Sequence, residues 1–238
     1  MEQYASVADF LKQHKSSSLP YCFYGARKIA YSEMHAAVES FSGLLLSAGA
    51  TGQNVALFCE NTPEYICAYF ANAYAGNTNI PINTALTDPE IISEVEYCDC
   101  NWIICRSEHA ARLMKLAGSL GCGIISIDNY LHASIICNPQ SRRVRQNDSS
   151  IAVMLHTSGT TGNPKKVMLT HENLIANTWS NIQSLSLTKD DKVLIVLPMF
   201  FGYCHTGAFP ISGHQLTSFP FTTAVVAKWK RSFQRPAL

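Results

Sequence analysis

A run of small polar residues near the middle of the chain is the segment best suited to chemistry. Residues 157–165 read Thr-Ser-Gly-Thr-Thr-Gly-Asn-Pro-Lys and follow closely after an apolar run at 151–155. Glycine tolerates positive φ and lets the backbone approach a ligand, so successive amide hydrogens can converge on phosphate oxygens. The hydroxyls add donors without adding repulsive charge, and the lysine adds a compact positive charge. The run therefore predicts a phosphate-binding loop.

Seven residues of this loop are predicted to contact the phosphates of a ligand. They are Thr157, Ser158, Gly159, Thr160, Thr161, Gly162 and Lys165. Lys165 and Thr160 are also predicted to be catalytic, because an ammonium and a hydroxyl can stabilise charge that develops on phosphates during a reaction.

Two other interpretations of the loop can be weighed on the sequence. A loop rich in glycine and threonine is often an ordinary turn, but the whole run 157–166 placed after a core strand favours a ligand-binding loop. A Walker loop is excluded, because Gly159 and Gly162 are too close together and no Gly-Lys-Ser or Gly-Lys-Thr follows.

The elements that must position this loop alternate between strands and helices. Helix starts are predicted at Ser32 as a cap, at Asn61 or Thr62 followed by proline, and at Thr87 with a glutamate three residues later. A further helix is expected around residues 110–120. Short apolar runs predict core strands at residues 55–59, 79–83, 102–105, 123–127, 151–155 and 167–169. This alternation predicts an α/β fold with a largely parallel sheet flanked by helices.

Charge and hydropathy exclude several other classes of function. The formal net charge is +1, from 18 basic and 17 acidic residues, so nothing in the overall charge suggests a nucleic-acid or membrane-surface partner. Arg142, Arg143 and Arg145 lie in a polar linker candidate at 138–150, and a solvated loop is preferred because no aromatic residues interleave with them. No apolar stretch is long enough to span a bilayer as a helix.

The cysteines and the first residues of the chain indicate a reducing compartment. Nine cysteines stand at irregular spacings, and no secretory signal is visible at the start, so reduced thiols and a cytoplasmic location are expected. Cys98, Cys100 and Cys105 lack the paired spacing of a zinc site, and buried thiols are the preferred interpretation. No metal-ligating residues are predicted.

The loop and its surroundings resemble the adenylate-forming superfamily of acyl-CoA synthetases, nonribosomal peptide synthetase adenylation domains and luciferase. Residues 157–167 with His171 are similar to that family's Thr-Ser-Gly-Thr-Thr-Gly-x-Pro-Lys-Gly-Val segment and its downstream histidine. The one departure is Lys166, where the family usually has glycine, so either of two adjacent lysines could face the nucleotide. His171 could equally cap the helix that follows it.

The resemblance extends to both sides of the loop. Residues 54–64 and 73–83 look like the family's strand-helix-strand unit. Residues 197–203 resemble the segment that lines the family's carboxylate pocket, although Phe201 stands where many members have histidine. His205 could replace that histidine and is a third candidate catalytic residue, while a structural role for it stays open.

The resemblance implies attack of a carboxylate on the α-phosphate of ATP, with magnesium as cofactor and coenzyme A or a carrier-protein thiol as second substrate. Aromatic residues around 200–203 favour a fatty or aryl acid, as in fatty acid metabolism, and amino acids remain open. The family's adenine-stacking, ribose-binding and C-terminal lysine motifs are not visible here. The chain is therefore expected to be an incomplete N-terminal large domain that is weakly active or inactive alone. A complementing C-terminal polypeptide is a candidate partner.

Three segments are expected from these patterns. Residues 1–140 form an N-terminal α/β subdomain, residues 141–212 carry the phosphate loop, and residues 213–238 form an atypical basic tail that is truncated or out of frame. No acidic residue follows Asp191. The alternatives to a ligase-family enzyme are a nucleotide-binding module without catalysis and a structural remnant.

Overall fold

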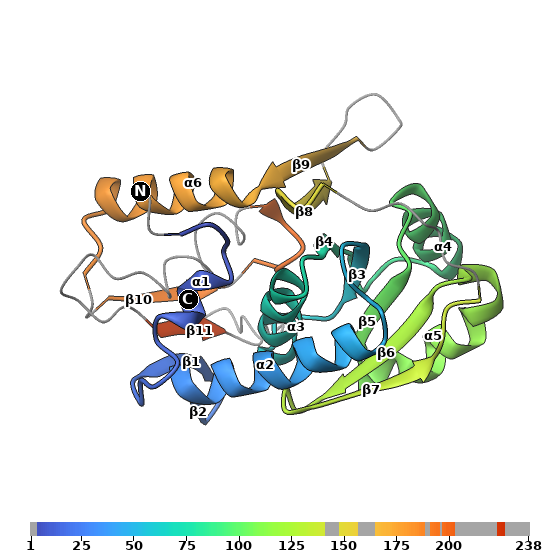
Figure 1. Cartoon of the computed structure of the whole chain (residues 1–238), viewed down its shortest axis with the longest axis horizontal. Helices are drawn as coiled ribbons and strands as arrows, with labels where there is room; N and C mark the ends of the chain where they lie inside the picture. Colours follow the sequence, from blue (N-terminus) through green and yellow to red (C-terminus); the bar gives the residue numbers. More distant parts are fainter. Residues whose placement is uncertain are drawn as a thin grey trace, which may run out of the picture.

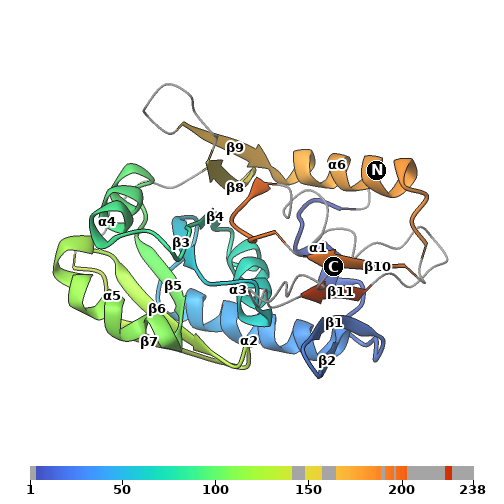
Figure 2. The same ribbon diagram turned by 180° about the vertical axis from the view of Figure 1, so that it is seen from behind.

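The computed structural model describes most of the chain, in six stretches. These are residues 4–140, 148–156, 165–188, 191–195, 197–202 and, for the backbone alone, 223–226. Two sheets and six helices make up the described part, and Figures 1 and 2 show them from opposite sides.

The larger sheet has seven strands in the order β7-β6-β5-β3-β4-β8-β9. Its strands are β3 (Asn54–Phe58), β4 (Thr78–Pro81), β5 (Trp102–Arg106), β6 (Gly123–Asp128), β7 (His132–Cys137), β8 (Ile151–His156) and β9 (Lys166–Thr170). The five central strands are parallel, and β7 and β9 pair antiparallel at the two edges. The predicted α/β fold with a largely parallel sheet is therefore confirmed.

Helices cover both faces of this sheet (Figure 1). The helices α2 (Tyr31–Ser47) and α3 (Pro63–Tyr74) pack on one face, while α4 (Asp88–Tyr97) and α5 (Ser107–Leu120) pack on the other. Alternate residues of β3 serve the two layers, because Val55 and Leu57 join the core under α2 and α3 while Ala56 and Phe58 join the core under α4 and α5. Every residue of β3 is buried, as expected for a parallel strand covered on both sides.

The smaller sheet has four strands in the order β10-β11-β1-β2. It consists of β1 (Pro20–Tyr24), β2 (Arg27–Ala30), β10 (Lys192–Ile195) and β11 (Thr223–Val226). The strands β1 and β2 form a hairpin that turns at Gly25, where φ is +60°. The two remaining helices are α1 (Asp9–Lys12) and α6 (His171–Ser184). Each sheet thus contains strands that precede residue 140 in the sequence and strands that follow it.

The predicted helix starts have mixed outcomes. The capping box at α4 is present, and the Glu90 carboxylate accepts hydrogen bonds from the backbone and the hydroxyl of Thr87, both at 2.7 Å. The prediction for Ser32 is wrong: β2 runs straight into α2, Ala30 occupies the cap position, and Ser32 lies within the helix. Thr62 is the N-cap of α3, but its hydroxyl makes no cap hydrogen bond.

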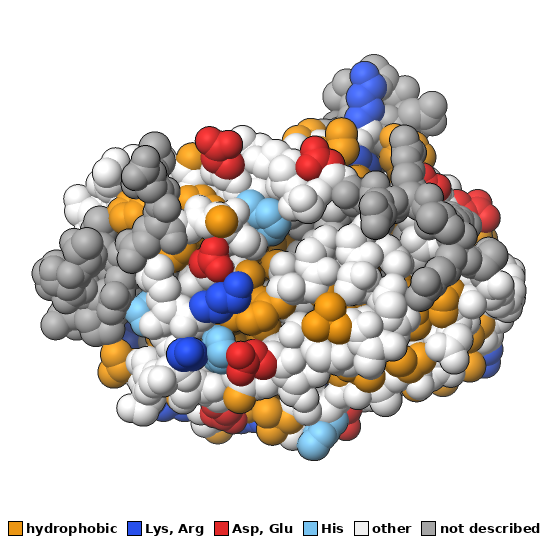
Figure 3. Space-filling model, viewed as in Figure 1, with side chains coloured by type: hydrophobic (Ala, Val, Ile, Leu, Met, Phe, Trp, Pro, Cys, Tyr) orange, Lys and Arg blue, Asp and Glu red, His pale blue; other side chains and the backbone are white. Residues whose placement is uncertain are grey.

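The described cysteines are free thiols, and the surface carries charges of both signs. Eight cysteines lie in the described part of the chain, and all are free thiols, of which only Cys137 is not fully buried. Acidic and basic side chains are interspersed on the face drawn in Figure 3. Within the described stretches, no helix combines the length and hydropathy needed to cross a membrane.

His171 ties the N-terminal segment to the start of α6. Thr170 is the N-cap of that helix and forms a capping box with Asn173, so His171 is not the cap. The Nδ1 atom of His171 accepts the backbone N–H of Val7 at 3.3 Å and lies 3.4 Å from the Ser6 hydroxyl. Burial lowers the pKa of this ring, and only the neutral ring can accept at Nδ1.

We predict that acidification through the range just below pH 6.5 weakens the fold through His171. The folded state disfavours the protonated ring, so its stabilising contribution is complete above the unfolded pKa of about 6.5 and falls as pH decreases. Denaturant unfolding at pH 7.5 and 5.5 measures the loss, and His171→Gln should reduce it. Burial also lowers the pKa of His35, so part of the loss should remain. Exposed His132→Gln is the matched control, and an equal reduction in both variants would contradict the assignment.

Candidate nucleotide-binding site

The predicted phosphate loop connects the two strands of an edge hairpin. The strands β8 and β9 pair antiparallel, and His156 stands opposite Lys166 at the end of the ladder next to the loop. The loop residues Thr157, Ser158, Gly159, Thr160, Thr161 and Gly162 lie outside the described residues, and so does His205. The structure therefore describes His156, which precedes the loop, and Lys166, which follows it. Of the predicted site residues, it describes Lys165.

The structure gives the two adjacent lysines different surroundings. Lys165 is exposed at the end of the loop, just before β9 begins. The side chain of Lys166 is only 5% exposed, and its ammonium lies 2.6 Å from the carboxylate of Glu94 on α4. Lys166, which replaces the family's glycine, is therefore committed to a contact inside the protein.

Glu94 also binds the residue at the other end of the loop. The Nε2 atom of His156 lies 2.7 Å from the same carboxylate oxygen that receives Lys166. Burial alone would raise the pKa of Glu94, but the hydrogen bonds from His156 and Lys166 outweigh it and hold the pKa below its usual value. The carboxylate is therefore ionised at neutral pH and can balance cationic charge.

The hairpin loop begins at the edge of the sheet where the parallel strands end. The strands β3 and β4 lie between β5 and β8, and the chain passes from β4 back across β3 to reach β5. In open α/β sheets, ligands bind outside the carboxyl ends of the strands, and the switch of direction in this sheet lies between β3 and β5. The phosphate loop therefore leaves β8 at the edge where this fold type usually binds ligands.

The segment that resembles a carboxylate pocket is held at this same edge. Asn61, three residues beyond the end of β3, donates to the carbonyl of Leu197 and accepts the backbone N–H of Met199, both at 2.7 Å. The hydroxyl of Tyr65 on α3 donates to the Met199 carbonyl at 3.1 Å. Asn61 therefore acts as an anchor for this segment and not as the helix cap proposed as one alternative from the sequence.

The anchored segment also contacts the strand that carries the loop. A methyl group added at Gly202 would lie 3.3 Å from Leu155 on β8. The rings of Phe200 and Phe201 pack with their centroids 4.4 Å apart, and Phe201 remains 49% exposed. The structure thus brings an aromatic pair and the base of the phosphate loop to one region.

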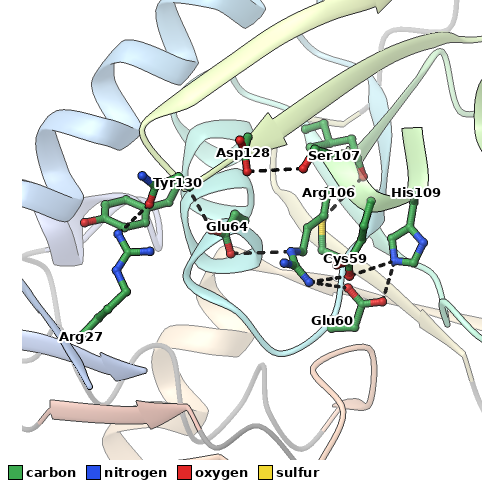
Figure 4. A network of polar contacts seen from close by, with 12 residues as sticks. Arg27, Cys59, Glu60, Glu64, Arg106, Ser107, His109, Asp128 and Tyr130 are labelled. Atoms are coloured by element: carbon green, nitrogen blue, oxygen red, sulfur yellow. Dashed lines mark hydrogen bonds and ion pairs between the residues drawn. The ribbon is translucent and has the colours of Figure 1, made fainter. Parts of the chain in front are cut away.

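A second polar cluster lies at the carboxyl ends of β3 and β5 (Figure 4). Arg106, the last residue of β5, lies 2.6 Å from Glu108, 3.3 Å from Glu60 and 3.9 Å from Glu64. His109 lies 2.6 Å from the other oxygen of Glu60. Hydrogen bonds and ion pairs from these groups hold the pKa of Glu60 low despite its partial burial.

The same cluster contains a set of atoms with metal-ligand character. One ligand atom each from Glu60, Glu108 and His109 lies within 4.8 Å of the others. The guanidinium of Arg106 already contacts both carboxylates, however, and a cation there would face a fixed positive charge. The arrangement fits an ion-pair network that ties the ends of β3 and β5 to α3 and α5.

Four residues of this region were missed by sequence reasoning. They are Asn61 in its anchoring role, Tyr65, Glu94 and His156. His156 carried a usable signal, because an ionisable residue directly precedes the loop. Glu94 carried none, since its partner Lys166 is 72 positions away and meets it only through the sheet topology.

The sequence is similar to several acid–CoA ligases. It is 28% identical over 178 residues to 4-coumarate–CoA ligase of Vanilla planifolia, covering 68% of this chain and 32% of that protein. It is also 28% identical over 178 residues to feruloyl-CoA synthase of an Amycolatopsis species, with 74% of this chain and 35% of the other covered. The chain thus spans about a third of the length of these curated relatives.

Solved structures share the fold. The ATP-bound MatB of Rhodopseudomonas palustris superposes with a TM-score of 0.74 at 22% identity, over 92% of this chain and 45% of that one. The anthranilate CoA ligase AuaEII in complex with anthranoyl-AMP gives a TM-score of 0.77 at 19% identity, over 95% of this chain and 45% of that one. At these identities the likeness establishes the fold alone.

A family model for AMP-binding enzymes matches residues 11–234, which includes most of the segment 213–238. This match covers nearly all of the chain and agrees with the parallel sheet and with the loop between β8 and β9. The chain therefore belongs to the AMP-binding enzyme family.

Proposed function

We propose that this chain binds magnesium-ATP through residues 157–165 and supplies the phosphate-binding part of an enzyme that activates a carboxylic acid as its acyl-adenylate. The observation that carries the proposal is the hairpin, in which a loop of glycines and hydroxyl residues leaves the carboxyl edge of a parallel sheet. The named CoA ligases and synthetases among its relatives support the same class of reaction.

The residues around the loop fit a polyanion. Lys165 is exposed beside the loop, whereas the neighbouring Lys166 already contacts Glu94. We therefore assign the phosphate contact to Lys165, together with the amides and hydroxyls of Thr157, Ser158, Gly159, Thr160, Thr161 and Gly162. Magnesium bound to ATP would supply further positive charge on the phosphates.

The proposed reaction requires the protein to position the two reactants and to stabilise the negative charge on the phosphates. The acid's carboxylate attacks the α-phosphate and pyrophosphate leaves, so the protein must hold two anions in line and offset the charge that develops between them. Lys165 and Thr160 are the proposed catalytic groups from this chain. His205 is retained as a third candidate, and coenzyme A or a carrier-protein thiol is the proposed acceptor.

An apolar acid of the fatty or aryl class is the proposed substrate. The aromatic pair Phe200 and Phe201 lies beside the strand that carries the loop, and Phe201 is half exposed. Stacking on such rings favours a flat or apolar acid. The free thiols of the described cysteines support the proposed cytoplasmic setting.

Catalysis by this chain alone is a separate question from nucleotide binding. The chain spans about a third of the length of the curated relatives, and a complementing polypeptide is a proposed partner. A nucleotide-binding module without catalysis is the second candidate function.

We predict that the purified chain binds magnesium-ATP and shows little or no exchange of labelled pyrophosphate into ATP with a panel of fatty, aryl and amino acids. Calorimetry measures the first and the exchange assay the second. Binding without turnover supports the module, and robust turnover shows that the chain suffices for catalysis. A folded protein that releases no heat with magnesium-ATP would contradict the proposal.

We further predict that Lys165→Ala weakens magnesium-ATP binding about 10-fold or more, because a charge-assisted contact to phosphate is lost. Thr160→Ala should weaken it less, because a neutral donor is removed. Lys115→Ala is the matched control, since Lys115 is an exposed lysine on α5. Equal affinities in the Lys165 and Lys115 variants would show that Lys165 does not contact the nucleotide.

A further inference from the structure

One carboxylate contacts both ends of the phosphate loop. Lys166 and His156 stand opposite each other where β9 begins and β8 ends. Their nitrogen atoms lie 2.6 Å and 2.7 Å from the same oxygen of Glu94, which belongs to a helix on the face of the sheet. Neither side chain is fully solvated, since that of Lys166 is 5% exposed and that of His156 is 31% exposed.

We propose that Glu94 is a positioning residue that fixes the base of the phosphate loop by bridging Lys166 and His156. This inference rests on the proposed function, because it concerns how the loop is held ready for a triphosphate. It adds a role for Lys166 that the resemblance does not contain, since the family usually has glycine at that position.

The burial of the Lys166 ammonium explains why this bridge requires a carboxylate. An ammonium that is almost completely removed from water is costly to bury unless a counter-charge and hydrogen bonds accompany it, and Glu94 supplies both. Because Lys166 and His156 share one oxygen of Glu94, a movement of either loop end would weaken a contact in a poorly solvated place. Fixing the ends of a segment before a ligand binds lowers the conformational entropy that is lost on binding.

The bridge also separates the roles of the two lysines. With its charge balanced by Glu94, Lys166 contributes little net attraction to an anion outside the sheet. Lys165, which is exposed at the end of the loop, is the lysine assigned to the phosphates. Lys166 and a hydrogen bond from Cys100 lower the pKa of Cys98, at the end of α4, to about 7.

The test uses hydrogen exchange of residues 151–156 and 165–170 without nucleotide, together with thermal unfolding and magnesium-ATP calorimetry. Glu94→Gln should raise exchange in both strands about 10-fold, lower the melting temperature and weaken ATP binding about 10-fold. Removal of one partner of a buried ion pair leaves the other charge uncompensated, so this variant is also the one most prone to unfold.

A double variant and two control variants distinguish a positioning role of Glu94 from a purely structural ion pair. In Glu94→Gln/Lys166→Met both charges are gone, so the melting temperature should recover while fast exchange and weak ATP binding remain. A purely structural ion pair would instead restore all three. Lys166→Arg keeps the cation and should retain the original exchange and affinity, as should Glu96→Gln, which alters an exposed glutamate of the same helix.

The outcomes separate this inference from the proposed function. Unchanged exchange in the double variant would overturn the bridge, and so would increased exchange with ATP affinity within about twofold of the original. Failure of the unaltered chain to bind ATP would overturn the proposed function. In that case, hydrogen exchange of β8 and β9 measured without nucleotide would still show whether Glu94 holds the two ends of the loop.

Discussion

Burial of the parallel sheet on both faces is the constraint on which the rest of this structure depends. The strand β3 is buried along its whole length, with alternate side chains committed to helices above and below. Such a sheet has no face on which to present polar groups. Chemistry is therefore restricted to the strand ends, and the carboxyl edge holds the hairpin loop, the anchored segment 197–202 and the network around Arg106.

Charge at this edge is balanced in pairs and networks. Glu94 offsets the charge of Lys166 and also contacts His156, and Arg106 lies among Glu60, Glu64 and Glu108. These groups are partly or largely withdrawn from water, so each network has both a cost of desolvation and a gain from specific hydrogen bonds. Balanced charges can fix elements relative to one another without competing for a ligand.

Much of the fold was predictable because its signals are local. The apolar runs at β3, β5, β6 and β8 gave strands, and the Thr87–Glu90 capping box gave the start of α4. The strand β7 was missed: its residues are at most partly buried, and it pairs at an edge. Ser32 was misassigned because the chain enters α2 straight from β2, so that the cap position falls on Ala30.

The candidate site was predictable only in its loop. The run 157–165 can be recognised from its composition. Glu94 cannot be distinguished from other helical glutamates in the sequence, because only the fold places it next to Lys166. Asn61 shows the same limit, since a residue that reads as a helix cap instead holds a segment more than a hundred positions away. Long-range partners of this kind leave no pattern in a single sequence.

The central claim is that the loop between β8 and β9 binds a triphosphate. The most direct measurement is hydrogen exchange of peptides covering residues 151–170, compared with and without magnesium-ATP. The account predicts protection concentrated at the loop and lost in Lys165→Ala. Exchange that is identical in both conditions for a folded chain at saturating nucleotide, or protection confined to distant elements such as α2 and β7, would contradict it.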